Sequence, residues 1–158
     1  MFLRLWLLPA LVFALLPGCG SVPLDSSPPQ RFDLNGRWVL DPARSDTEQP
    51  RGRGFLSQDF PLLAAREIRI EQDSRSMGIE YAGGSYRDVT WGERRRGVWE
   101  VRAGWREGNL YIFSEAADVS ALEIWQLSAD GAELTIELRV KGADAGRYQR
   151  VFRRSLEI

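Results

Sequence analysis

Histidine is absent from this 158-residue chain, and cysteine and lysine each occur only once, as Cys19 and Lys141. Without histidine, neither a Ser-His-Asp triad nor a histidine-ligated zinc or haem site can form. A single cysteine excludes a disulfide within the chain. The glycine-rich stretches lack the spacing of phosphate-binding or dinucleotide-binding loops. We therefore expect no cofactor, no metal site and no enzymatic activity.

The charges are nearly balanced, with 21 basic and 22 acidic residues and a formal net charge of −1. A net charge so close to zero does not give the strongly positive surface that nucleic-acid binding requires. We therefore exclude nucleic acid as a partner. Glycoside hydrolysis would need only two carboxylates at a defined distance. The glutamates that could supply them fall on polar strand faces, where solvated charge is expected: Glu71, Glu80, Glu100 and Glu137.

The N-terminal region combines Arg4, an apolar run over residues 5–16 and the sequence Leu16-Pro17-Gly18-Cys19. It resembles a bacterial lipoprotein signal peptide with its lipobox. The apolar run is shorter than the roughly 20 residues of a transmembrane helix. The resemblance implies cleavage after residue 18 and acylation of Cys19, which makes the lipid bilayer a partner. Because Gly20 rather than aspartate follows the cysteine, we expect attachment to the outer membrane, facing the periplasm.

The expected organisation is therefore a signal peptide at 1–18, a lipidated cysteine with a flexible tether at 19–31, and a folded domain at 32–158. Residues 20–31 are rich in serine and proline and cannot form a core. Within the domain, residues 42–60 are polar and predict a long loop. Residues 61–66 predict one short helical turn.

The rest of the domain alternates apolar and polar residues, most clearly at 132–140, which is typical of half-buried strands. Turn signals separate the runs, and Asp130-Gly131 is the strongest hairpin signal. We predict about nine strands, and a bulge where the apolar phase shifts between residues 122 and 127. The nine ranges are 36–41, 66–73, 76–82, 85–91, 97–106, 109–115, 121–128, 132–140 and 147–154.

Short connections imply an all-β antiparallel meander of about 8–9 strands. Closure into a small barrel would remove the unpaired edges of such a sheet, and a two-sheet β-sandwich is the alternative. The first strand opens with Gly36-Arg37-Trp38, a G-x-W motif that resembles the start of a lipocalin-like (calycin-type) barrel. The resemblance implies that Gly36 and Trp38 close one end of the barrel beneath an arginine of the last strand. That strand offers Arg150, Arg153 or Arg154, of which we take Arg153 as the candidate.

Two groups of residues are candidates for binding. Aromatic side chains could line an apolar cup for a lipid or another hydrophobic ligand: Trp99, Trp105, Tyr111, Phe113 and Trp125. A predicted hairpin loop carries three successive arginines that could bind an anion through charge-assisted bonds: Arg94, Arg95 and Arg96.

Two functions follow from these candidates. The first is a membrane-anchored periplasmic lipoprotein that binds a small hydrophobic or lipidic ligand in a lipocalin-like barrel. The second is an envelope lipoprotein with a filled barrel, whose loops bind a protein or a cell-wall partner.

Overall fold

The computed structural model describes residues 23–46, 59–142 and 145–155, which form ten strands and one short 3-10 helix. The signal peptide, Cys19 and most of the loop at 42–60 lie outside the described residues. The elements are β1 (Gly36–Leu40), η1 (Pro61–Leu63), β2 (Glu67–Gln72), β3 (Ser76–Tyr81), β4 (Ser85–Thr90), β5 (Gly92–Arg96), β6 (Trp99–Arg106), β7 (Asn109–Ala116), β8 (Val119–Leu127), β9 (Glu133–Lys141) and β10 (Gly146–Arg154).

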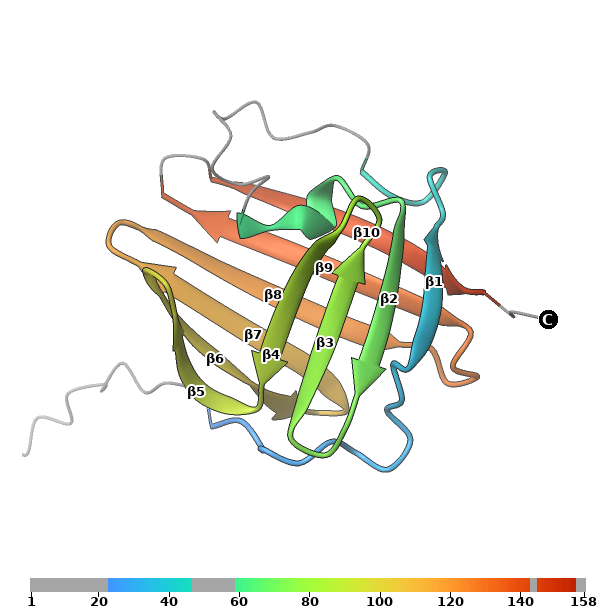
Figure 1. Ribbon diagram of the computed structural model, residues 1–158, viewed down its shortest axis with the longest axis horizontal. Coiled ribbons are helices and arrows are strands. Elements are labelled where there is room, and N and C mark those ends of the chain that lie inside the picture. The colour runs from blue at the N-terminus through green and yellow to red at the C-terminus, as the bar shows by residue number, and fades with distance from the viewer. Residues whose placement is uncertain (1–22, 47–58, 143–144, 156–158) are drawn as a thin grey trace, which may run out of the picture.

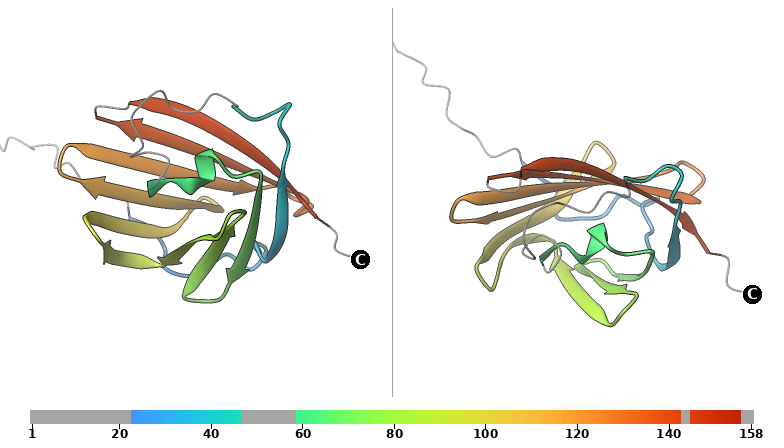
Figure 2. Two further views of the ribbon diagram at one scale, coloured as in Figure 1. Left: turned by 45° about the horizontal axis from the view of Figure 1, so that its top comes forward. Right: turned by 90° about the horizontal axis from the view of Figure 1, so that it is seen from above.

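All ten strands belong to one antiparallel sheet in the order β4-β3-β2-β1-β10-β9-β8-β7-β6-β5 (Figure 1). The first and last strands meet, with Trp38 opposite Arg154. The sheet curls into a nearly closed barrel, and η1 lies over its interior (Figure 2). The predicted all-β meander and barrel are confirmed, and the sandwich alternative is wrong. Among the described residues no strand pairing joins β4 to β5, and we call this line of contact the seam.

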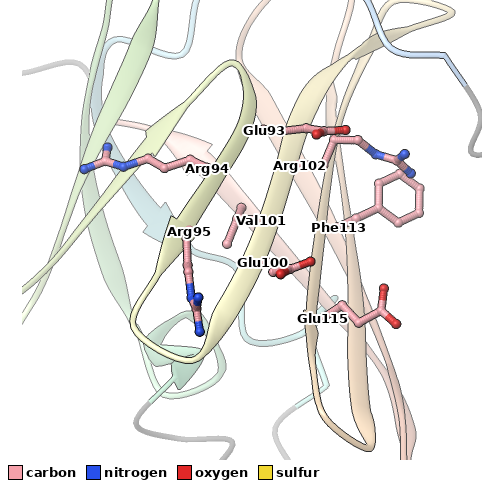
Figure 3. Close-up of a pocket in the computed structure, with 8 residues that line it drawn as sticks. All are labelled: Glu93, Arg94, Arg95, Glu100, Val101, Arg102, Phe113 and Glu115. Atoms are coloured by element: carbon pink, nitrogen blue, oxygen red, sulfur yellow. The ribbon is translucent and has the colours of Figure 1, made fainter.

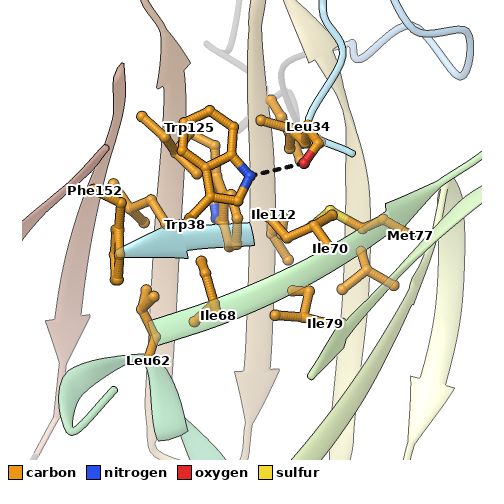
Figure 4. Packing of buried hydrophobic residues seen from close by; sticks show 14 of the residues in the cluster. Leu34, Trp38, Leu62, Ile68, Ile70, Met77, Ile79, Ile112, Trp125 and Phe152 are labelled. Atoms are coloured by element: carbon orange, nitrogen blue, oxygen red, sulfur yellow. Dashed lines mark hydrogen bonds between the residues drawn. The ribbon is translucent and has the colours of Figure 1, made fainter. Parts of the chain in front are cut away.

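The core lies inside the barrel because alternate residues of each strand point inward. Trp38, Trp125 and Phe152 are fully buried with the isoleucines of β2 and β3 (Figure 4). The Trp38 indole Nε1 donates a 2.8 Å hydrogen bond to the carbonyl of Leu34. Its polar atom is therefore satisfied in an apolar setting.

One end of the barrel is closed as the G-x-W resemblance implies, but by a different arginine. The Arg154 guanidinium lies 4.2 Å from the Trp38 ring centroid, and it donates to the carbonyls of Asp33 (2.7 Å) and Gly131 (2.8 Å). Arg153 instead pairs with Asp41 at 2.9 Å on the outside. The reason is strand alternation: Arg154 shares the inward face of β10 with Phe152, and Arg153 faces solvent.

The segment before β1 crosses this closed end (Figure 1). Asp25 exchanges backbone hydrogen bonds of 2.9 and 2.8 Å with Trp105 of β6. Trp105 lies past the position where β5 begins to pair with β6, which is Gly92 opposite Ala103. A side chain at Gly104 would come within 2.7 Å of the Asp25 carbonyl oxygen and of Leu24, so only glycine allows this approach. Phe32 is buried against Trp105 with ring centroids 4.5 Å apart. The described part of the expected tether, from residue 23 onward, thus lies against the barrel.

The stretch predicted as an arginine-bearing loop is instead a strand, β5. Its five residues, Gly-Glu-Arg-Arg-Arg, contain no apolar side chain, so no alternation marked them as a strand. Their backbone pairs with β6, from Gly92 opposite Ala103 to Arg96 opposite Trp99. β5 is therefore the strand by which the structure exceeds the nine that were predicted.

The predicted bulge in β8 is also wrong. The strand keeps continuous register with β7 over residues 119–125 and with β9 over residues 120–127. Ala121, Glu123 and Trp125 point inward, whereas Leu122 and Ile124 lie on the outer face. The two-residue period of the inward face is therefore unbroken. The pattern only looked shifted because one inward position holds a charged residue, Glu123.

Candidate ligand-binding site

A charged pair lies inside the barrel, formed by Arg87 of β4 and Glu123 of β8. Arg87 Nη1 is 2.7 Å from Glu123 Oε1, and their side chains are 2% and 1% exposed. Both residues hold inward positions on strands at opposite sides of the interior. The Trp125 indole Nε1 donates to the other carboxylate oxygen at 3.1 Å. Buried charges are rare in proteins, and those that occur are paired, as here.

Aromatic and polar side chains surround this pair. The Phe60 ring centroid lies 5.9 Å from the Arg87 guanidinium, and Phe60 packs edge-on against Trp99 at 5.6 Å. Arg96 reaches inward from β5 and donates a 3.5 Å hydrogen bond to the Asp59 carbonyl. The interior half toward η1 therefore combines aromatic walls with charges.

The pKa values of these groups show how the charges act on one another. Burial opposes the charge of Arg87, but the attraction of Glu123 and Tyr81 leaves the pKa of Arg87 above its usual value. Burial and then repulsion from Arg87 lower the pKa of Arg96. Burial raises the pKa of the Tyr81 hydroxyl to about 12, so this group is neutral near neutral pH. The site therefore holds a neutral phenol beside a salt-bridged arginine.

Several buried polar atoms in this region form no hydrogen bond of good geometry, although Arg87 interacts with both Tyr81 and Glu123: Tyr81 Oη, Arg87 Nη2, Ser114 Oγ and Glu123 Oε1. The contact between Arg87 and Glu123 is close, but it lacks hydrogen-bond geometry. Ser114 and Glu123 occupy neighbouring inward positions on β7 and β8. Buried polar groups are normally satisfied by protein, water or ligand, so this cluster marks a place where a polar partner is expected.

The seam borders the same cluster. Arg94 of β5 bridges it, forming an ion pair with Asp88 and a 2.9 Å hydrogen bond with Thr90 of β4. A narrow pocket of about 10 Å³ lies beneath, lined by Arg87 and Arg96 among others. This volume is about that needed for one water molecule. Side chains rather than backbone hydrogen bonds therefore hold β4 and β5 together.

The five aromatic candidates do not form one cup. Trp99, Trp105 and Trp125 are buried inside the barrel. Tyr111 and Phe113 lie on the outer face of β7, since Leu110 and Ile112 take its inward positions. The Arg102 guanidinium lies 4.9 Å from the centroid of the Phe113 ring. Trp105 packs at the closed end, against Trp91 and Phe32.

The three arginine candidates likewise do not form one group, because alternation along β5 puts Arg95 on the face opposite to that of Arg94 and Arg96. Arg94 spans the seam, Arg95 is exposed on the outer face and Arg96 points inward. They do not converge on one anion. Arg95 instead borders an outer hollow of about 550 Å³ over β5, β6 and β7 (Figure 3). The residues lining this hollow are Glu93, Arg94, Arg95, Glu100, Val101, Arg102, Phe113 and Glu115.

The sequence interpretation missed Arg87, Glu123 and Tyr81. A usable signal exists for Glu123, because counting back in steps of two from Trp125 reaches it and then Ala121. The apolar neighbours Leu122 and Ile124 hid this phase. Among the described ranges, no group of three or more acidic, histidine or cysteine side chains is placed to hold a metal. Within those same ranges, no helix has the length and hydropathy to cross a membrane.

No protein-family model and no curated protein matches the sequence. Solved structures do match. The chain is similar to "REP1-NXSQ fatty acid transporter", with 15% identity and a TM-score of 0.57 over 78% of this chain and 98% of that one. It is similar to human cRBP IV, with 18% identity and a TM-score of 0.56 over 78% and 99% of the two chains. It is also similar to a mutant of the fluorescent protein UnaG, with 16% identity and a TM-score of 0.56 over 78% and 97%. The chain therefore has the lipocalin-like barrel fold that these proteins share.

Proposed function

We propose that this protein is a non-enzymatic binding protein that holds a small hydrophobic or lipidic molecule inside its barrel. The observation that carries this proposal is the buried cluster of unsatisfied polar atoms around Arg87 and Glu123, set among aromatic side chains. An amphipathic molecule could place its polar end there and its apolar part against Phe60 and Trp99. A fatty acid transporter among the similar structures supports the same class of ligand.

The test is to purify the full chain gently from its native envelope and to identify any bound small molecule by mass spectrometry. The proposal expects an amphipathic molecule in stoichiometric amount. Replacing Trp99 by alanine, with correct folding verified by circular dichroism, should reduce its recovery. The matched control is Phe113→Ala, which removes an aromatic ring from the outer face. Ligand-free protein that also fails to bind added lipids would contradict the proposal.

The proposal includes attachment to the outer membrane, facing the periplasm, through acylated Cys19. The support is the lipobox at residues 16–19 and the absence of aspartate at position 20. Since Asp25 is fixed to Trp105 by backbone hydrogen bonds, only residues 19–24 would separate the lipid from the barrel. Six extended residues span about 20 Å. The barrel would then be held close to the bilayer by its closed end.

A second candidate function is binding of an envelope protein or cell-wall partner on the outer surface. The observation that favours it is the hollow over β5, β6 and β7, where the opposed charges Glu93 and Arg102, and likewise Arg95 and Glu100, form no ion pair with each other. Cross-linking from a photoreactive residue at position 95 tests this function. Position 69, exposed on β2, serves as the control. Capture of the same partner from both positions, or from neither, would contradict the second function.

A further inference from the structure

We propose that the polar end of the bound molecule is an uncharged group that both donates and accepts hydrogen bonds, such as an alcohol, and that Glu123 disfavours a free carboxylate. This inference rests on the proposed binding function and specifies its ligand.

The first argument is the balance of charge inside the barrel. Arg87 is already paired with Glu123 at 2.7 Å. Arg96, the next arginine in this region, is attracted by Glu123 and then by Asp59, whose carbonyl also accepts its hydrogen bond. These two arginines and two carboxylates sum to zero. A carboxylate ligand would add a second negative charge beside Glu123 in a site with little water to screen it.

Arg150, a further inward arginine, does not alter this balance at the site. Its guanidinium donates to the carbonyls of Asp46 at 2.5 Å and Ala65 at 3.1 Å. Those bonds occupy both terminal nitrogens and direct them toward the backbone near η1. The Arg87 cluster is therefore the region where unsatisfied donors and acceptors occur together.

The second argument is the inventory of unsatisfied atoms. Arg87 Nη2 can only donate, Glu123 Oε1 can only accept, and the hydroxyls of Tyr81 and Ser114 can do both. An alcohol can accept from Arg87 and donate to Glu123 at the same time. An ionised carboxylate only accepts, so it would supply no donor to Glu123 Oε1, which has an ion pair with Arg87 but no hydrogen bond of good geometry. An uncharged donor–acceptor group therefore complements the cluster better.

The experiment compares two probes with the same apolar chain, 1-dodecanol and dodecanoate, by titration at pH 7.5 with tryptophan fluorescence as the signal. We expect the wild-type protein to bind the alcohol at least about tenfold more tightly than the acid. Glu123→Gln removes the negative charge and should cut this preference by about tenfold or reverse it. The matched control is Glu100→Gln on the outer face of β6, which should leave the ratio unchanged.

A wild-type preference for dodecanoate would overturn the inference, and so would a folded Glu123→Gln protein with an unchanged ratio. If that variant does not fold, Ser114→Ala is the second test, because it removes one donor–acceptor group without changing charge. It should weaken dodecanol binding more than dodecanoate binding, and an equal effect on both probes would contradict the inference. Absence of binding to either probe, together with ligand-free protein from the envelope, would instead refute the proposed function.

Discussion

Removing the negative charge of Glu123 should destabilise the barrel strongly, because it leaves the Arg87 guanidinium buried without a counter-charge. The two side chains are 2.7 Å apart at their closest atoms. Unit charges about 4 Å apart interact by about 4 kcal/mol at an effective dielectric constant of 20. Breaking a buried ion pair by removing one partner costs about 3–5 kcal/mol. We therefore expect Glu123→Gln to lower the free energy of unfolding by that amount. Glutamine can still accept the hydrogen bond from Trp125, so the loss reports the charge.

The double variant Arg87→Met with Glu123→Gln makes the prediction specific. It removes both charges, so the unfolding free energy should return to within about 1.5 kcal/mol of the wild-type value or exceed it. Glu100→Gln, an exposed change, should shift it by less than about 0.5 kcal/mol. The assay is urea unfolding at pH 7 followed by tryptophan fluorescence. The reasoning would be refuted if the double variant were as unstable as the single one.

Three further predictions concern other parts of the molecule. Trp38→Ala should lower the free energy of unfolding by about 3–5 kcal/mol. Arg154→Met should lower it by about 0.5–2 kcal/mol through loss of the cation–π contact, and the exposed change Arg153→Met should lower it less. A different ranking in urea unfolding would contradict the placement of these three residues. The pKa of Tyr81 is about 12 in the fold and about 10 in an unfolded chain. The contribution of neutral Tyr81 to the free energy of unfolding should therefore be fully present below pH 10 and be lost as pH rises toward 12. Tyr81→Phe should flatten that decline in unfolding measured against pH, and an unchanged slope would argue against the assignment. Cys19→Ser should move the protein from the membrane to the soluble fraction on immunoblots, and a variant that still pelleted with membranes would argue against the anchor.

Alternation along the strands was enough to predict most of the barrel. Strands such as β9 carry apolar residues at every second position, so their ranges and their inward faces followed from the sequence. The closure of β1 against β10 followed from short connections and from the need to pair sheet edges.

The errors share one physical cause: a local pattern does not report what lies opposite in space. β5 has no apolar residue, and only its pairing with β6 makes it a strand. Glu123 was not identified from the sequence, because its burial depends on Arg87, 36 positions earlier in the chain and across the barrel. The choice of Arg154 over Arg153 depends on the register of β10 with β1, which a single residue step reverses.

The seam has a consequence for how copies of this protein behave when crowded. A sheet that does not close fully has two edge strands, and edge strands can pair with those of another molecule and lead to aggregation. Here one edge strand is made of Gly-Glu-Arg-Arg-Arg. Two molecules approaching edge to edge along β5 would force their guanidinium groups together and repel. The arginines of β5, one of which also bridges the seam, thus discourage self-association.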